Sequence, residues 1–150
     1  MKPITVTREI DAPPERVWAV ITDLEGSSEV IAAIDKVEVL TPGPFAVGTT
    51  WRETRTMFGR SATEEMTVSD VNPGHGYTVV ADSSGVHYTS SFIVEPSSGG
   101  SRLTMTFGGE ATSRGARAMG ALMAPFMRSS MTKALARDLG DIAAAAERRP

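Results

Sequence analysis

Hydrophobic and polar residues alternate through most of this chain and change to a helical spacing near its end. The segment "ITVTREI" at residues 4–10 alternates in the way typical of a β-strand with one buried face. From residue 49 to about residue 110 the same two-residue period recurs, interrupted by the turn-forming segments "NPGHG", "DSSG" and "PSSGGS". After "SRGAR", apolar residues follow i, i+3, i+4 spacing up to Ala146. This pattern predicts a long amphipathic helix at the C-terminal end.

Two short helices are predicted between the first strand and the later ones. The segment "DAPPERVWAVITDL" has prolines suited to a first helical turn, followed by an apolar stripe. "EGSSEVIAAI" predicts a second helix, and "DKVEVL" returns to strand. The predicted fold class is therefore α+β, with a single domain over residues 1–150 and about seven antiparallel strands. The C-terminal helix is the one element long enough to cover the apolar face of such a sheet.

Composition narrows the classes of protein that this chain can represent. The 150 residues are 41% hydrophobic and 22% charged, and the net charge is −3 without a basic block. A nucleic-acid partner is therefore not expected. The absence of cysteine excludes disulfides and thiolate metal sites. Neither a secretory signal segment nor an apolar run long enough to cross a membrane is found, so we predict a soluble, cytoplasmic protein without membrane insertion.

The segment "TWRETRTMFGR" raises the question of why charged and apolar residues share one strand face. That face carries Trp51, Glu53, Arg55 and Met57. A two-residue turn at Gly59-Arg60 predicts that Arg55 lies opposite Glu64 on the next strand. Two interpretations stay open: the pair lies in water at the hairpin tip, or it lines a cavity and orients a polar group of a ligand. In the second case Glu53→Gln or Arg55→Ala should weaken ligand binding more than stability.

Methionine and aromatic residues are concentrated on the predicted inner faces. Apart from Met1, the methionines on these faces are Met57, Met66, Met105, Met119, Met123, Met127 and Met131. Tyr88 and Phe92 share one strand face, and Met105 shares another with Phe107. Methionine fills irregular space and adapts to varied contacts, so these residues indicate either a loosely specified core or an adaptable pocket.

Motifs for metal binding and nucleophilic catalysis are not found. His87 alternates with Tyr88 and is predicted to point outward, while His75 lies in the "NPGHG" turn. No cofactor and no metal ion are expected. Acid–base chemistry could still use a buried carboxylate or phenol, and the candidates are Glu53, Glu64, Asp82 and Tyr88.

Several segments together resemble the START/Bet v 1-like (SRPBCC) superfamily, in particular its polyketide cyclase/dehydrase and lipid-transport branch. These segments are "EIDAPPERVWAVITDLEG", "VGTTWRET", "VSDVNPGHGYTVV", "FIVEPSSGGSRLTMTF" and "LMAPFMRSSMTKALARDLGDIAAAAE". The resemblance covers essentially the whole chain. It implies a helix-grip fold, in which a curved antiparallel sheet wraps around the long C-terminal helix and leaves a deep cavity. The mixed face of Trp51, Glu53, Arg55 and Met57 would then border that cavity.

The leading hypothesis is a protein that binds a hydrophobic or aromatic small molecule, such as a lipid or polyketide. The predicted ligand-binding residues are Trp51, Glu53, Arg55, Glu64, Met66, Tyr88, Phe92, Met105, Met119, Met123, Phe126 and Met127. One alternative is a polyketide aromatase/cyclase or dehydratase that uses Glu53, Glu64 or Tyr88 to move protons. Another is an interaction module or homodimer. A helix bend at Pro125 and the "TPGPFAVG" loop are the predicted controls of access to the cavity.

Overall fold

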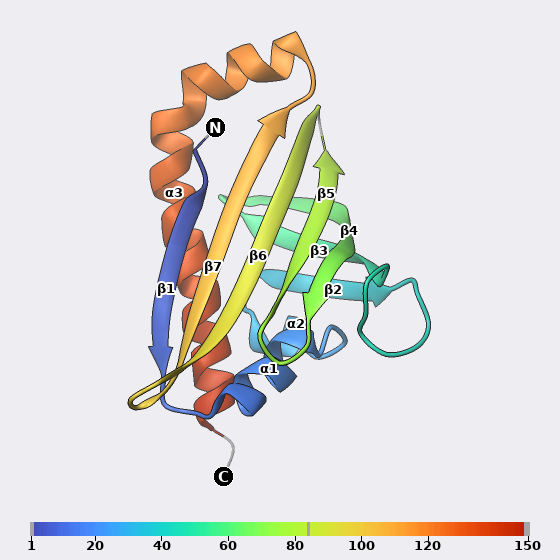
Figure 1. Cartoon of the computed structure of the whole chain (residues 1–150). Coiled ribbons are helices and arrows are strands. Elements are labelled where there is room, and N and C mark those ends of the chain that lie inside the picture. Colours follow the sequence, from blue (N-terminus) through green and yellow to red (C-terminus); the bar gives the residue numbers. More distant parts are fainter. Residues whose placement is uncertain (1, 84, 149–150) are drawn as a thin grey trace.

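The computed structural model describes residues 2–83 and 85–148, without the side chains of residues 119–126. The element order confirms the predicted strand, two short helices, further strands and a long helix (Figure 1). The elements are β1 (Ile4–Ile10), α1 (Pro14–Thr22), α2 (Ser27–Val30), β2 (Ile34–Val39), β3 (Thr50–Met57), β4 (Arg60–Asn72), β5 (Gly76–Ser83), β6 (Val86–Ser97), β7 (Gly100–Ala111) and α3 (Arg114–Glu147).

The seven strands form one antiparallel sheet in the order β1-β7-β6-β5-β4-β3-β2. Figure 1 shows that β2, β3 and β4 lie across the direction of β1, β6 and β7, so the sheet is strongly curved. The long helix α3 packs against β1, β7 and α1, and its first turns run at a steep angle to the rest. This is the helix-grip arrangement, in which a curved sheet wraps around a helix and leaves space on its concave side.

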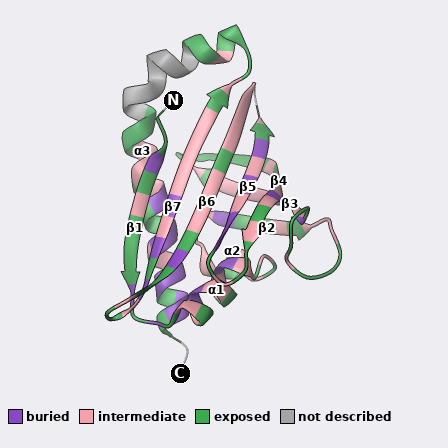
Figure 2. Ribbon diagram, viewed as in Figure 1, coloured by how far each residue is buried: buried purple, intermediate pink, exposed green. Residues whose placement is uncertain are grey.

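The core lies at the end of the molecule where α1 meets the second half of α3 (Figure 2). Its most buried apolar residues come from β1, α1, β4, β6 and β7, and from α3. On α3, Leu135, Leu139 and Ile142 are buried, whereas the described side chains at 127–129 are exposed. Among the described side chains of α3, those of its C-terminal half therefore pack in the core.

The β3–β4 hairpin differs from its predicted register by two residues. Its turn is Phe58-Gly59, and both residues have positive φ (54° and 76°), which is the type I′ geometry. Arg55 therefore lies opposite Ala62, and the predicted cross-strand pair between Arg55 and Glu64 is wrong. Glycine at the second central position satisfies a type I′ turn as well as it satisfies the predicted type II′ turn at its first position. Because side chains alternate with period two, the shift leaves the inner face unchanged.

The facing of residues 76–82, which the sequence left open, is decided by the pairing of β5 with β6. Ser83 pairs with Val86, and from there Tyr77 is set opposite Phe92. Tyr77, Val79 and Ala81 are buried and belong to the inner face. The inner face of β5 therefore adds a buried tyrosine to the concave side of the sheet.

Candidate functional site

A cavity of about 460 Å³ lies between the concave face of the sheet and the helices. Every predicted ligand-binding residue with a described side chain lines it; Met119, Met123 and Phe126 lie outside the described side chains. The lining from the sheet includes Trp51, Glu53, Arg55, Met57, Glu64, Met66, Tyr77, Val79, Tyr88, Ser90, Phe92, Met105 and Phe107. The lining from the helices includes Val20, Ile21, Leu24, Val30, Met127, Met131, Leu135, Asp138 and Ile142. The wall is mostly apolar, and its few polar groups come from α2, β3, β4, β5, β6 and α3.

Aromatic rings close the deep end of the cavity. The ring of Tyr77 lies 4.7 Å from that of Phe45, 5.1 Å from Phe92 and 6.1 Å from Trp18, measured between centroids. The Tyr77 hydroxyl donates a hydrogen bond of 2.8 Å to the backbone carbonyl of Ile21 in α1. Burial, with a contribution from the charge of Glu53, raises the pKa of Tyr77, so the hydroxyl stays protonated and acts as a donor. Tyr77 thus fixes α1 to the sheet.

Tyr77→Phe should destabilise the protein by about 1–3 kcal/mol, because the Ile21 carbonyl would remain buried without its donor. Urea denaturation measures this loss. Tyr88→Phe is the matched control, since Tyr88 lines the same cavity but is only partly buried. A loss for Tyr77→Phe no larger than that for Tyr88→Phe would contradict the assigned role of the hydrogen bond.

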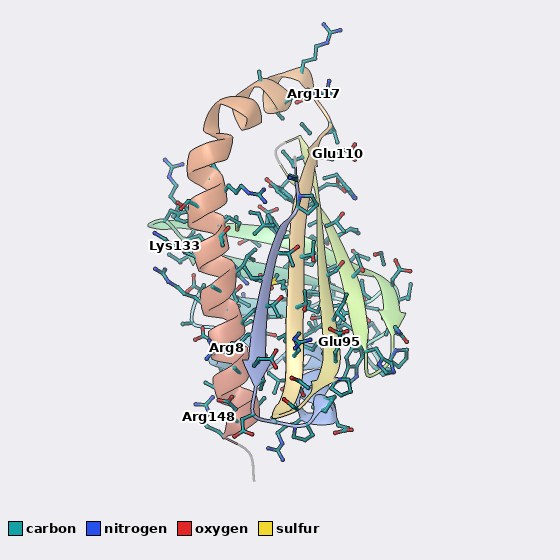
Figure 3. All side chains as sticks on the ribbon, turned by 60° about the vertical axis from the view of Figure 1, so that its left-hand side comes forward. Arg8, Glu95, Glu110, Arg117, Lys133 and Arg148 are labelled. Atoms are coloured by element: carbon teal, nitrogen blue, oxygen red, sulfur yellow. The ribbon has the colours of Figure 1, made fainter. Side chains whose placement is uncertain are left out.

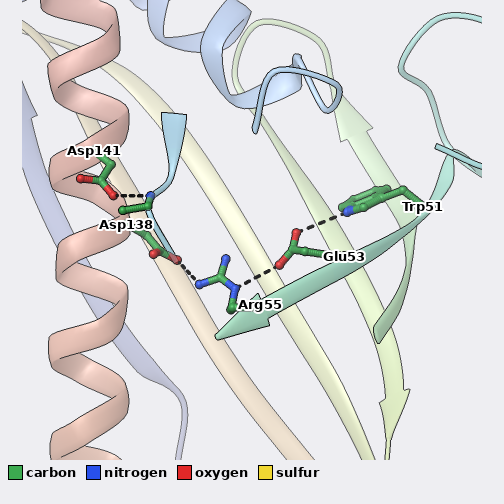
Figure 4. A network of polar contacts seen from close by, with 6 residues as sticks. Trp51, Glu53, Arg55, Asp138 and Asp141 are labelled. Carbon is green, nitrogen blue, oxygen red and sulfur yellow. Dashed lines mark hydrogen bonds and ion pairs between the residues drawn. The ribbon is translucent and has the colours of Figure 1, made fainter. Parts of the chain in front are cut away.

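A chain of hydrogen bonds crosses the cavity wall from β3 to α3 (Figure 4). The Trp51 indole Nε1–H donates to Oε1 of Glu53 at 3.4 Å, and Arg55 Nε donates to Oε2 of Glu53 at 3.1 Å. Arg55 Nη1 donates to Oδ2 of Asp138 at 2.8 Å. Only 21% of the Arg55 side chain, 11% of Glu53 and 6% of Asp138 are exposed. The strand pattern brings Glu53 and Arg55 to one face, and the curvature of the sheet brings that face to α3.

This network is more negative than a simple ion pair, because two carboxylates share one guanidinium. Desolvation works against the charge of Arg55, but the carboxylates of Asp138 and Glu53 outweigh it and raise the pKa of the guanidinium. Burial raises the pKa of Asp138; Arg55 counteracts this effect only in part, and the nearby Glu53 and Asp141 add to it. By contrast, the charged residues labelled in Figure 3 are all at exposed positions, including Glu95 and Lys133.

The raised pKa of Asp138 predicts a specific pH dependence of stability. The folded protein binds the carboxyl proton of Asp138 more tightly than the unfolded chain does. The stability that this proton contributes is therefore fully present below the ordinary pKa of 3.8. It is lost as the pH rises through the higher pKa of the folded state. Asp138→Asn cannot titrate, so wild type should lose stability relative to this variant as the pH rises above about 4. Paired urea denaturation series across pH measure the difference, and a relative gain for wild type would contradict the prediction.

The mouth of the cavity lies between the tip of the β3–β4 hairpin and α3. Trp51 on β3 is 5% exposed, whereas Phe58 in the turn that follows β3 is 60% exposed and Met127 on α3 is 41% exposed. Both Phe58 and Met127 line the cavity, as does the exposed Arg60. No residue of the "TPGPFAVG" loop is in the lining; its Phe45 instead packs on Trp18 and Tyr77. The hairpin tip, which was not among the access elements predicted from the sequence, is thus the rim.

A second group of polar residues lies on β4, β5 and β6. Ser83 Oγ donates to Oε1 of Glu64 at 2.9 Å, and the Tyr88 ring stacks on Phe107 with 5.6 Å between centroids. Burial, followed by the charge of Glu64, raises the pKa of Tyr88, so its hydroxyl stays a donor. The structure therefore places Tyr88 and Glu64, two of the predicted acid–base candidates, on the same wall of the cavity.

His87 and the acid–base candidate Asp82 lie outside the cavity. His87 points away from the cavity, as predicted, and its Nδ1 lies 2.7 Å from Oδ1 of the exposed Asp82. Asp82 is not in the cavity lining. Within residues 2–83 and 85–148, no cluster of three or more histidine, cysteine or acidic residues is arranged to hold a metal ion. None of the helices, as far as they are described, is long and apolar enough to cross a membrane.

Asp138 and Tyr77 are two residues of the site that were not predicted from the sequence. Asp138 lies three residues after Leu135 and four before Ile142, so the helical spacing of the apolar stripe already places it on the inner face. A charged residue on that stripe was the available signal. Tyr77 carried no such signal, because its facing depends on the length of the β5–β6 turn.

The sheet order, the long helix and the cavity define a Bet v 1-like protein of the SRPBCC superfamily. Within it, the chain belongs to the family described as polyketide cyclase/dehydrase and lipid transport, whose profile matches residues 1–147. No curated protein matches the sequence significantly.

Solved structures support this assignment at the level of the fold. The Zhui aromatase/cyclase from Streptomyces sp. R1128 superposes with a TM-score of 0.77 at 20% identity, covering 99% of this chain and 94% of its own. The protein TTHA0849 from Thermus thermophilus gives 0.76 at 22% identity, covering 97% of both chains. Ara h 8.0201 gives 0.69 at 14% identity, covering 97% of this chain and 95% of its own. At these identities the likeness concerns the fold alone.

Proposed function

We propose that this protein binds a hydrophobic or aromatic small molecule in the cavity between the sheet and α3. The observation that supports this most directly is the cavity itself, because a space of about 460 Å³ walled by apolar side chains with a few convergent polar groups is typical of ligand sites. Met66, Met105 and Met131 in its wall suit ligands of varied shape. The family assignment agrees with this proposal, since its description includes lipid transport.

Native mass spectrometry of the purified protein tests the proposal, followed by calorimetric titration with aromatic and aliphatic compounds. A stoichiometric adduct that leaves on denaturation, or saturable binding in the titration, would support it. A bare mass combined with no binding across compounds of different size and polarity would contradict it.

The second candidate function is a polyketide cyclase or dehydratase that uses the same cavity. Glu64 and Tyr88 on one wall supply a carboxylate and a protonated phenol, which are the groups that such proton transfers require. Glu53→Gln and Glu64→Gln should then each lower the turnover of a polyketide-like substrate by about a hundredfold or more. Turnover of a polyketide-like substrate that survives both changes would exclude these assignments.

A homodimer remains a prediction from the sequence. The sheet has open edges at β1 and β2, which are the surfaces that strand pairing between copies would use. Light scattering across a range of concentrations tests it, and a constant monomer mass would exclude it.

A further inference from the structure

The charged residues of the cavity are not balanced. Its described lining contains three carboxylates, from Glu53, Glu64 and Asp138, and two guanidinium groups, from Arg55 and Arg60. Arg60 lies at the exposed mouth, where water screens its charge. Arg55 is therefore the one cation of the deeper described lining, and it already pairs with Glu53 and Asp138. The inner part of the cavity thus carries a net negative charge.

Asp138 has an oxygen that can face a ligand. Its Oδ2 accepts from Arg55, while no protein group donates to its Oδ1 within the described part of the chain. In the described part of the chain, every fully buried side-chain oxygen or nitrogen has a hydrogen-bond partner. Because Oδ1 has none, it is not fully buried. Asp138 is only 4% exposed and lines the cavity, so the cavity is where this access lies.

An anionic ligand group placed beside Glu53 and Asp138 would lose its hydration, and it would find no unpaired cation in the deeper described lining to replace it. A hydroxyl or ammonium group would instead donate to a carboxylate oxygen that is already desolvated. The two kinds of ligand therefore differ in electrostatic energy at the same position.

We propose that the cavity selects apolar ligands whose polar group is a neutral donor or a cation, and rejects ligands with a carboxylate. This inference rests on the proposed function, because it concerns the ligand class of the same cavity. The selecting groups are Glu53 and Asp138, held in place by Arg55.

Calorimetric titration with four naphthalene derivatives that differ in one substituent tests the inference. The probes are 1-naphthylmethylamine, 1-naphthalenemethanol, 1-methylnaphthalene and 1-naphthoate, all at pH 7. The amine and the alcohol should bind more tightly than the methyl compound, and the amine at least about tenfold more tightly than the carboxylate, a ratio that one differential charge contact supplies. Carboxylate binding as tight as that of the alcohol would overturn the inference while leaving the proposed function intact. No binding of any of the four would count against both.

A pair of variants locates the selection. Asp138→Asn removes a charge from the cavity, whereas Asp141→Asn removes the same charge one turn away on α3, where Asp141 accepts from the Ala32 amide outside the cavity. With folding confirmed by thermal denaturation, Asp138→Asn should reduce the amine-to-carboxylate affinity ratio about tenfold, and Asp141→Asn should reduce it much less, because its charge lies outside the cavity. Equal effects of the two variants would assign the preference to the net charge of the protein and overturn the role of Asp138.

Discussion

Arg55→Ala should destabilise the protein by about 3 kcal/mol, because it leaves the Glu53 and Asp138 carboxylates buried near each other without their common cation. The value lies at the lower end of the range for buried pairs, since Arg55 is still about one-fifth exposed. Urea denaturation at neutral pH measures the loss. Part of it should return at acid pH, where protonation of Asp138 relieves the repulsion.

Arg52→Ala is the matched control for this experiment. Arg52 lies on the same strand with its side chain on the opposite face, and it pairs with Glu38 at 3.6 Å with both side chains about half exposed. Such surface pairs contribute between zero and about 1 kcal/mol. If Arg55→Ala costs no more than Arg52→Ala, the network of Glu53, Arg55 and Asp138 would have no stabilising role.

Ser90→Trp should strongly weaken ligand binding while it leaves the fold intact. Ser90 lies in the middle of β6 and lines the cavity, so an indole ring at this position would occupy the space that the ligand is proposed to fill. Because that space of about 460 Å³ is already present, the added ring need not displace the packed core. We expect affinity to fall at least about a hundredfold, equivalent to about 2.7 kcal/mol, by calorimetric titration with the best-binding compound.

Ser91→Trp is the control for Ser90→Trp, because the neighbouring residue points to the other face of the same strand. Ser91 exchanges a hydrogen bond with Thr78 on the outer face, so this variant loses a little stability but should retain ligand binding. Binding that survives Ser90→Trp would mean that the ligand lies outside the cavity. Binding lost in both variants would point to a general disturbance of the sheet.

The order of elements was predictable because each depends on local pattern. β1 was predicted with its observed bounds, Ile4–Ile10, since alternation and a following proline-rich turn define it within a few residues. The helix α1 begins at Pro14, slightly later than the predicted segment, because proline suits the first helical position. The inner faces of β6 and β7 were correct for the same reason, as period-two alternation determines facing once a strand is identified.

The partner of Arg55 was not predictable from local pattern. The hairpin turn allowed two assignments that preserve the faces, and the choice between them alters which residue lies opposite Arg55. In the structure its partners are Glu53, two residues earlier on β3, and Asp138, which is 83 residues away in sequence. A long-range contact of this kind depends on sheet curvature, which accumulates from twist over all seven strands and is not encoded at any one position.

The sequence by itself determined the fold class, the family and which residues of β3, β4, β6 and β7 lie on the concave face, because periodicity and turn residues act locally and were consistent along the chain. Only the tertiary structure decided that the mixed face of β3 meets α3, that Asp138 completes its charged network, and that the cavity opens at Phe58 and Met127. These features arise where the curved sheet and the helix approach each other, so they depend on the separation of elements and on burial. Burial also acts on the charged network, since desolvation raises the pKa of the Asp138 carboxyl group and Arg55 counteracts this effect only in part.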